Sequence, residues 1–286
     1  MDLTSGFSGG VEFAPHFEPR QSIAYVVFDF DGTLSLIRQG WPEVMLPMFV
    51  EMLPRQEGVT VQEDETMLLD DIMTLNGKQT IYQMIQLATR IKERGGIPRE
   101  PLFYKHEYLR RLNERIESRL RQIQDRTCEP DEYLVFGSRR LLEALRGLGV
   151  PMYLASGTDE EFVKREAALL GIEDYFGGHI YGALDDYKSF SKKMVIERIL
   201  RENGIPGEAL LSFGDGYVEI ENTKEVGGLA VAVASDEANN GSGQMDGWKR
   251  DRLMGVGADV VIPYYRDVDR LLEVIWPDSG KKKERK

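Results

Sequence analysis

The sequence predicts an α/β fold, in which a doubly wound parallel sheet carries an inserted all-helical domain. In the second half of the chain, short apolar runs alternate with helix-length amphipathic stretches, the pattern of strands connected by helices. The runs are nearly continuous in apolar residues, as expected for strands that helices cover on both faces. Between the first run and the second lie roughly a hundred residues with no convincing strand, more than a β–α–β connection needs.

The expected strands and helices alternate along the chain. The strands occupy residues 23–30, 150–155, 179–182, 209–213, 229–234 and 258–262. The helices between them occupy residues 138–148, 159–170, 189–203 and 267–275. Gly149, Gly171 and Gly204 follow three of these helices, and glycine is the residue that most readily ends a helix in left-handed backbone. The glycines therefore support the predicted boundaries.

The long stretch after the first strand predicts a separate helical domain. Its expected helices, at residues 42–53, 62–75, 80–94 and 101–126, are separated by the turn-rich pieces PRQEG, NGK and RGGIP. The predicted organisation is an N-terminal arm (1–20), a core in two parts (21–36 and 132–277), the inserted helical domain (37–131) and a basic tail (278–286). The tail ends in KKKERK and is expected to be solvated and disordered.

Composition and charge narrow the possible functions. The chain has 286 residues, 42% of them apolar, and its 36 basic and 48 acidic residues give a formal charge of −12. This balance argues against a nucleic-acid partner, because phosphate contacts need an excess of Lys and Arg. No run is long enough to span a bilayer, the first residues lack a signal-peptide pattern, and Cys128 is the only cysteine. We therefore expect a cytoplasmic protein without disulfides; the sequence does not indicate an oligomeric state.

Two carboxylates stand at the end of the first predicted strand, where Asp29 and Asp31 flank Phe30 and lead into Gly32. Because side chains alternate along a strand, Asp29 and Asp31 are expected to project to the same side. Acidic groups at the end of a buried strand are costly unless they have a role. Such a pair can bind a divalent metal ion, or divide the roles of nucleophile and acid–base group. An Asp-Gly turn alone would explain Asp31 and Gly32 but not Asp29.

The segment DFDGT at residues 29–33 matches the first motif of the haloacid dehalogenase superfamily, DxDGT after a hydrophobic strand, and the chain resembles this superfamily. The resemblance implies a Rossmann-like core with the first strand at its centre, and a helical cap of the first type formed by the insertion. It also implies that Asp29 is the nucleophile, that Asp31 is the acid–base group and that Thr33 belongs to the phosphate site. Phosphoglycolate-phosphatase-like members share this layout.

Two further motifs of the superfamily follow later in the chain. Ser156-Gly157-Thr158, after the second predicted strand, matches the second motif, where a hydroxyl and backbone N–H groups bind a phosphoryl oxygen. Ser156 and Gly157 are the expected phosphate ligands, and Thr158 is expected to cap the next helix. The segment GDGYVE at residues 214–219 matches the fourth motif. Asp215 should bind Mg²⁺, and Glu219 should be a ligand or support one, with Glu221 a less suited rival.

The third motif is a lysine near the start of the helix before the strand that ends near Asp215. Lys188, Lys192 and Lys193 are candidates, and Lys192 best fits the spacing to the apolar helix start. Its ammonium would offset negative charge on Asp29 and on the phosphoryl group. The expected metal ligands are Asp29, Asp31 (through its carbonyl), Asp215 and, less securely, Glu219.

Together these residues imply a Mg²⁺-dependent phosphatase. It would hydrolyse a small phosphate monoester, such as phosphoglycolate, a sugar phosphate or a nucleotide, through an aspartyl-phosphate at Asp29. A phosphomutase of the β-phosphoglucomutase type would keep the same core residues and stays open, as does a non-catalytic binding module on this fold. A dehalogenase is disfavoured, because those relatives lack the second aspartate. The cap is expected to choose the substrate through the turn at residues 76–80, where Lys78 and Gln79 offer donors, and through Trp41.

Overall fold

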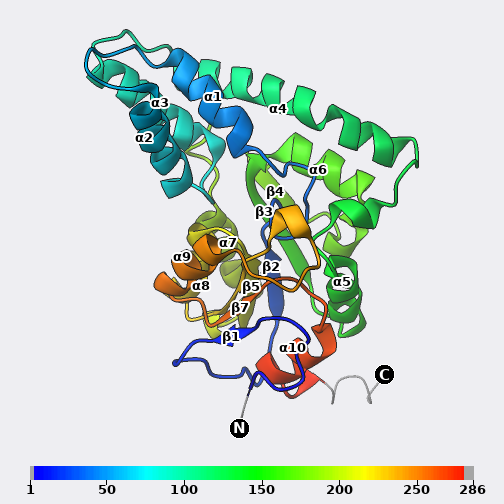
Figure 1. Ribbon diagram of the computed structural model, residues 1–286. Coiled ribbons are helices and arrows are strands. Elements are labelled where there is room, and N and C mark those ends of the chain that lie inside the picture. Colours follow the sequence, from blue (N-terminus) through cyan, green and yellow to red (C-terminus); the bar gives the residue numbers. More distant parts are fainter. Residues whose placement is uncertain (1–2, 280–286) are drawn as a thin grey trace.

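A computed structural model describes residues 3–279 and has an α/β fold with a helical cap (Figure 1). Within these residues, seven strands form one sheet in the order β1-β7-β6-β5-β2-β3-β4. Neighbouring strands are parallel except β1 and β7, which are antiparallel. The strands are β1 (Glu12–Phe13), β2 (Tyr25–Phe28), β3 (Met152–Asp159), β4 (Ile180–Ala183), β5 (Leu210–Gly214), β6 (Leu229–Val233) and β7 (Val260–Ile262). The first predicted strand, β2, therefore lies between β5 and β3.

Helices cover both faces of the sheet because its strands carry apolar side chains on both sides. Phe28 of β2 lies in a core with residues of α5, α6 and α10, whereas Val27 packs on the opposite face against Ile196 of α7. On that second face, α8 and α9 pack Ile220 and Leu253 against β6. These helices are α5 (Ser138–Gly147), α6 (Glu160–Leu169), α7 (Lys192–Asn203), α8 (Tyr217–Glu225), α9 (Gly247–Gly255) and α10 (Val268–Ile275). Short 3₁₀ turns occupy Pro130–Tyr133, Glu173–Phe176, Gly207–Ala209 and Glu237–Asn239.

The cap contains α1 (Pro42–Met52), α2 (Val61–Thr74), α3 (Thr80–Glu93) and α4 (Pro101–Gln124), which lie together beyond one end of the sheet (Figure 1). Local signals fix where these helices begin. Thr60 forms a capping box with Glu63 at the start of α2, and prolines occupy the first turn of α1 and α4. The apolar sides of the four helices form a core continuous with that of one sheet face, so the insertion is packed on the sheet domain.

The structure confirms the predicted strands and helices and adds elements that the sequence did not indicate. β1 is only two residues long, too short to show a pattern, and it adds the N-terminal arm to the edge of the sheet. α9 was also missed, because its sequence GWKRDRLMG carries few apolar residues. The helix expected from residue 189 begins at Lys192, where the Ser191 hydroxyl accepts the N–H of Met194 at 3.1 Å. Residues 280–286 of the predicted tail lie outside the described residues.

No helix within residues 3–279 is long and apolar enough to cross a membrane.

Candidate active site

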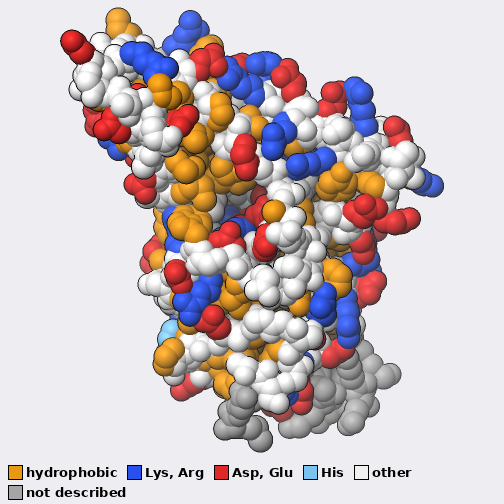
Figure 2. All heavy atoms as spheres, in the orientation of Figure 1, with side chains coloured by type: hydrophobic (Ala, Val, Ile, Leu, Met, Phe, Trp, Pro, Cys, Tyr) orange, Lys and Arg blue, Asp and Glu red, His pale blue; other side chains and the backbone are white. Residues whose placement is uncertain are grey.

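The candidate active site lies at the carboxyl edge of the sheet, beneath the cap. Three adjacent strands, β2, β3 and β5, bring Asp29, Ser156 and Asp215 to this edge, where open α/β sheets bind their ligands. The side chains line a cavity of about 80 Å³ that cap residues close from the other side. Figure 2 shows the surface hollowed between cap and sheet, with acidic side chains at the hollow.

Asp29 is buried at the floor of the cavity. Its Oδ1 accepts the N–H of Phe30 at 2.8 Å, and its Oδ2 lies 2.8 Å from Nζ of Lys192. Burial raises the pKa of Asp29 well above its usual range, and the nearby Glu219 and Asp215 add to the rise, whereas Lys192 opposes it. The ionised form of Asp29 therefore depends on positive charge close to its carboxylate.

Lys192, at the start of α7, supplies such a charge. Its buried Nζ lies 2.8 Å from Asp29 and 2.9 Å from Oε2 of Glu219, and the two carboxylates raise its pKa against the effect of burial. The other two candidate lysines lie elsewhere: Lys193 is exposed and pairs with Glu225, and Lys188 lies over the ring of Tyr187. Of the three, only Lys192 contacts Asp29.

Glu219 supports this arrangement from the first turn of α8. It is buried, its Oε2 accepts from Lys192, and its Oε1 accepts the N–H of Gly216 at 2.6 Å. Burial alone would raise its pKa, but the charge of Lys192 prevails and the pKa of Glu219 is lowered. Glu221, its rival in the sequence, is exposed.

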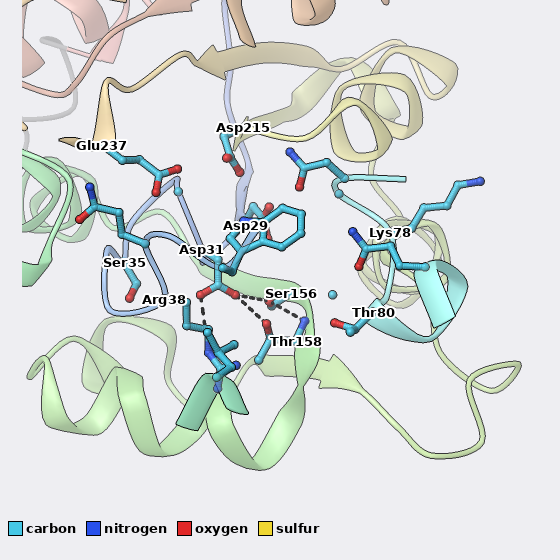
Figure 3. Close-up of a pocket in the computed structure, with 18 of the residues that line it drawn as sticks. Asp29, Asp31, Ser35, Arg38, Lys78, Thr80, Ser156, Thr158, Asp215 and Glu237 are labelled. Atoms are coloured by element: carbon cyan, nitrogen blue, oxygen red, sulfur yellow. Dashed lines mark hydrogen bonds and ion pairs between the residues drawn. The ribbon is translucent and has the colours of Figure 1, made fainter. Parts of the chain in front are cut away.

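Asp31 projects into the cavity from the turn after β2 (Figure 3). Its Oδ2 accepts the hydroxyl of Thr158 at 2.7 Å and lies 3.5 Å from Oγ of Ser156. Burial raises the pKa of Asp31 to about 6, although Arg38 and the Thr158 hydroxyl work against the rise. The expectation that Thr158 caps α6 is wrong, because β3 continues to Asp159 and α6 begins only at Glu160.

Arg38 lies beside Asp31 and belongs to a buried ion pair. Its guanidinium donates two hydrogen bonds to Glu166 of α6, at 3.1 and 2.7 Å, and its Nε lies 3.9 Å from Oδ1 of Asp31. Glu166 is fully buried and Arg38 is nearly so, and a buried charge without an opposite charge would destabilise the fold. Arg38 thus places positive charge near Asp31 without leaving an unmatched cation.

Asp215 follows β5 and is surrounded by polar partners. Its Oδ2 lies 2.9 Å from Nζ of Lys249, which also lies 2.6 Å from Oε1 of Glu237. Burial raises the pKa of Asp215, and Lys249 opposes this rise. Thr33, expected at the phosphate, is instead fully buried outside the cavity with its hydroxyl 3.4 Å from Oδ1 of Asp215. Gly32 is required here, because a Cβ at its position would lie 2.2 Å from Oδ2 of Asp215.

The acidic side chains fit a divalent cation. Carboxylate oxygens of Asp29, Asp215 and Glu219 lie within 4.8 Å of one another, an all-oxygen set of the kind that Mg²⁺ prefers. All three carboxylates also have protein partners on both oxygens: Phe30 and Lys192 at Asp29, Thr33 and Lys249 at Asp215, and Lys192 and Gly216 at Glu219. Carboxylates also outnumber ammonium groups around the site, so a divalent ion would reduce their repulsion.

The cap turn at residues 76–80 closes over the sheet edge by backbone contact. A Cβ on Gly157 would lie 2.7 Å from the carbonyl oxygen of Lys78, so glycine lets the cap approach this closely. The structure corrects the expected donor roles of this turn. The Gln79 amide donates to the carbonyls of Tyr187 and Phe190 and is not in the cavity wall, and the Lys78 ammonium points away from it, over the ring of Tyr82 (Figure 3).

Comparison with known proteins places this arrangement in a family. Residues 23–227 match the family model of the haloacid dehalogenase-like hydrolases. The chain belongs to this family. The matched region contains Asp29, Asp31, Ser156, Lys192, Asp215 and Glu219. No curated protein matches the sequence.

Solved structures of haloacid dehalogenase-like proteins are similar to this chain in fold. One is a hydrolase of the family from Deinococcus radiodurans with bound phosphate and sodium. Its TM-score is 0.54 at 16% identity, and the alignment covers 91% of this chain and 97% of that protein's chain. A predicted phosphoglycolate phosphatase from Haemophilus somnus has a TM-score of 0.57 at 15% identity, over 87% and 97% of the two chains. A putative β-phosphoglucomutase from Thermotoga maritima has a TM-score of 0.51 at 18% identity, over 88% and 100%. Identities this low show the shared fold alone.

Four charged residues of the site lie outside the family motifs that the sequence displays. Glu237 and Lys249 follow the region matched to the haloacid dehalogenase-like hydrolases. Lys249, on α9, contacts Asp215, and Glu237, in a 3₁₀ turn, contacts Lys249. Arg38 and Glu166 are 128 positions apart and meet only in the folded chain. Arg38 follows the first motif closely, which is the one signal that could have drawn attention to it.

Proposed function

We propose that this protein is a Mg²⁺-dependent phosphatase that hydrolyses a small phosphate monoester through an aspartyl-phosphate intermediate at Asp29. The observation that carries the proposal is the convergence of Asp29, Asp31, Lys192 and Asp215 on one cavity at the sheet edge. A nucleophilic carboxylate, an acid–base group and charge stabilisation are the parts that this reaction needs. Membership of a hydrolase family that includes phosphatases supports the reaction class.

Each side chain has a distinct task in the proposed reaction. The Asp29 carboxylate attacks phosphorus in line with the leaving oxygen, and Asp31 donates its proton to that oxygen. Asp31 then removes a proton from the water that hydrolyses the aspartyl-phosphate. Lys192 and the hydroxyl of Ser156 stabilise the phosphoryl oxygens, and Lys192 also opposes the rise that burial causes in the pKa of Asp29. Thr158 holds the Asp31 carboxyl group in place.

Asp29 and Asp215, with the backbone carbonyl of Asp31, would hold Mg²⁺, and Glu219 would support the site through Lys192. When bound, the ion would offset the repulsion between the substrate phosphate and the Asp29 carboxylate. Thr33 and Lys249 position the Asp215 carboxylate through contacts with its two oxygens. We also propose that the protein acts in the cytoplasm. We propose a free small molecule as its substrate, because the net charge of −12 disfavours binding to nucleic acid.

Removal of the metal is expected to stop turnover. With p-nitrophenyl phosphate, EDTA should lower the rate at least about a hundredfold, and added Mg²⁺ should restore it. Asp215→Ala should abolish both Mg²⁺ binding, measured by calorimetry, and turnover, whereas Glu221→Ala, which removes an exposed carboxylate from α8, should change neither. Inorganic phosphate released from a sugar phosphate is the readout that distinguishes a phosphatase, because a phosphomutase would return an isomerised sugar ester instead. Mg²⁺ binding without phosphate release from any ester would indicate a non-catalytic binding module.

The pH dependence should identify Asp31 as the general acid. Because burial raises its pKa to about 6, the proton needed by the leaving group is lost as the pH rises through that value. kcat/KM for an alkyl phosphate, a poor leaving group, should therefore fall above pH of about 6, approaching tenfold per unit. p-Nitrophenyl phosphate carries the same phosphoryl group but needs little protonation, so its kcat/KM should fall less. Asp31→Asn should remove the difference between the two profiles; parallel profiles in the unmodified protein would exclude this role.

A further inference from the structure

We infer that the substrate's leaving group is small, uncharged and rich in hydroxyl groups, as in a sugar or polyol phosphate, rather than a carboxylic acid or a second phosphate. The inference rests on the proposed phosphatase function and specifies its substrate class. Its basis is that Arg38 and Lys192 in the wall of the cavity are each paired with carboxylates while the Lys78 ammonium points away from it, together with the neutral polar groups that the cap presents there.

The cationic side chains that line the cavity within residues 3–279 are Arg38, Lys78 and Lys192. Lys192 lies between Asp29 and Glu219, at 2.8 and 2.9 Å. Arg38 is matched by its two hydrogen bonds to the buried Glu166. Lys78 contributes to the wall, but its ammonium lies over the ring of Tyr82 and points away from the carboxylates (Figure 3).

A second negative charge on the substrate would therefore find no unpaired cation directed into the cavity beyond the phosphate site. It would instead meet the carboxylates of Asp31, Asp215 and Glu237, which line the same cavity. Taking a carboxylate or phosphate out of water without an opposite charge is strongly unfavourable. The metal ion of the proposed function does not change this, because it would be engaged by Asp29, Asp215 and the reacting phosphate.

The part of the cavity that faces the cap suits hydroxyl groups. Amides and hydroxyls that can both donate and accept hydrogen bonds line it: Gln39, Asn76, Thr80, Gln83 and Tyr108. The hydroxyl of Thr80 is directed toward Ser156 and Asp31 (Figure 3). Trp41 adds an aromatic wall, which packs well against the C–H face of a sugar. At about 80 Å³, the cavity is also far below the roughly 300 Å³ at which pockets for drug-sized ligands begin.

Matched pairs of esters test the inference, each pair differing in one charged group. The pairs are 2-hydroxyethyl phosphate with phosphoglycolate, glycerol 3-phosphate with 3-phosphoglycerate, and fructose 6-phosphate with fructose 1,6-bisphosphate. We expect kcat/KM for the less charged member to exceed that for the more charged member at least tenfold. Equal or better turnover of the charged members would overturn the inference. p-Nitrophenyl phosphate is the common control: if it too is not hydrolysed in Mg²⁺, the proposed function fails instead.

A cation introduced into the cap should relax this preference. Asn76 lines the cavity beside Lys78, and Asn76→Lys would place an ammonium there, whereas Asn76→Gln keeps an amide on a longer chain. The preference ratio within each pair should shrink at least tenfold in Asn76→Lys and change little in Asn76→Gln. Because each ratio is measured on one preparation, differences in folded fraction cancel. An unchanged ratio in Asn76→Lys, with the acidic esters still rejected, would show that the missing cation does not set the preference and would overturn the inference.

Discussion

Replacing Asp29 with Asn is expected to lower kcat at least about a thousandfold, or about 4 kcal/mol in the activation barrier. The amide of Asn carries no negative charge, so it is a poor nucleophile toward phosphorus and a poor ligand for Mg²⁺. Asn has nearly the same shape and can still accept the N–H of Phe30, and Lys192 keeps its contact with Glu219. The variant should therefore fold, which separates the loss of chemistry from a loss of structure.

Phosphate release and unfolding by denaturant should be measured together on this variant. Asp174→Asn is the matched control, because it makes the same change of charge at an exposed aspartate far along the chain. It should keep both activity and stability. If Asp29→Asn retains activity within about tenfold of the unmodified protein, a change of only about 1.4 kcal/mol, then Asp29 is not the nucleophile.

The fold was predictable from the sequence because its signals are local. The apolar runs that form β2 to β7 are short and uninterrupted, and helical periodicity with turn-rich breaks marks the four cap helices. β1 has no such signal, since two residues cannot establish a period and its place depends on pairing with β7. α9 was missed for a similar reason: charged residues dominate it, and Leu253 is its main buried apolar contact.

The sequence predicted only those residues of the candidate site that belong to short local motifs. Asp29, Asp31 and Asp215 follow strands and Ser156 lies near the end of β3, so sheet topology alone brings them together. Contacts made across the cap or between distant helices leave no trace in local sequence. Gln79 illustrates this: its amide looked like a substrate donor in an exposed turn, but the carbonyls of Tyr187 and Phe190 lie within its reach in the folded chain.

Lys192→Met should reduce activity and stability together. The ammonium lies between two buried carboxylates, so its removal leaves Asp29 and Glu219 without their common cation. Loss of one partner from a buried ion pair costs about 3–5 kcal/mol of unfolding free energy near neutral pH. kcat should fall at least about a hundredfold, since a charge aimed at the phosphoryl oxygens is lost. Lys193→Met changes the neighbouring, exposed lysine of the same helix and should alter neither quantity appreciably.

The destabilisation of Lys192→Met should depend on pH in a defined direction. In the unmodified protein, Lys192 lowers the pKa of Glu219, so this carboxylate stabilises the fold above its unfolded pKa and that contribution is lost as the pH falls. Without Lys192, burial raises the pKa of Glu219 and raises that of Asp29 further. The stability that such carboxyl groups contribute at low pH is lost as the pH rises through the folded pKa. Both effects make the stability difference largest at neutral pH and smaller toward pH of about 4, the usual pKa of these groups. Urea unfolding of both proteins at several pH values measures the difference, and a gap that stays constant or widens toward acid would show that Lys192 does not set the charge of this pair.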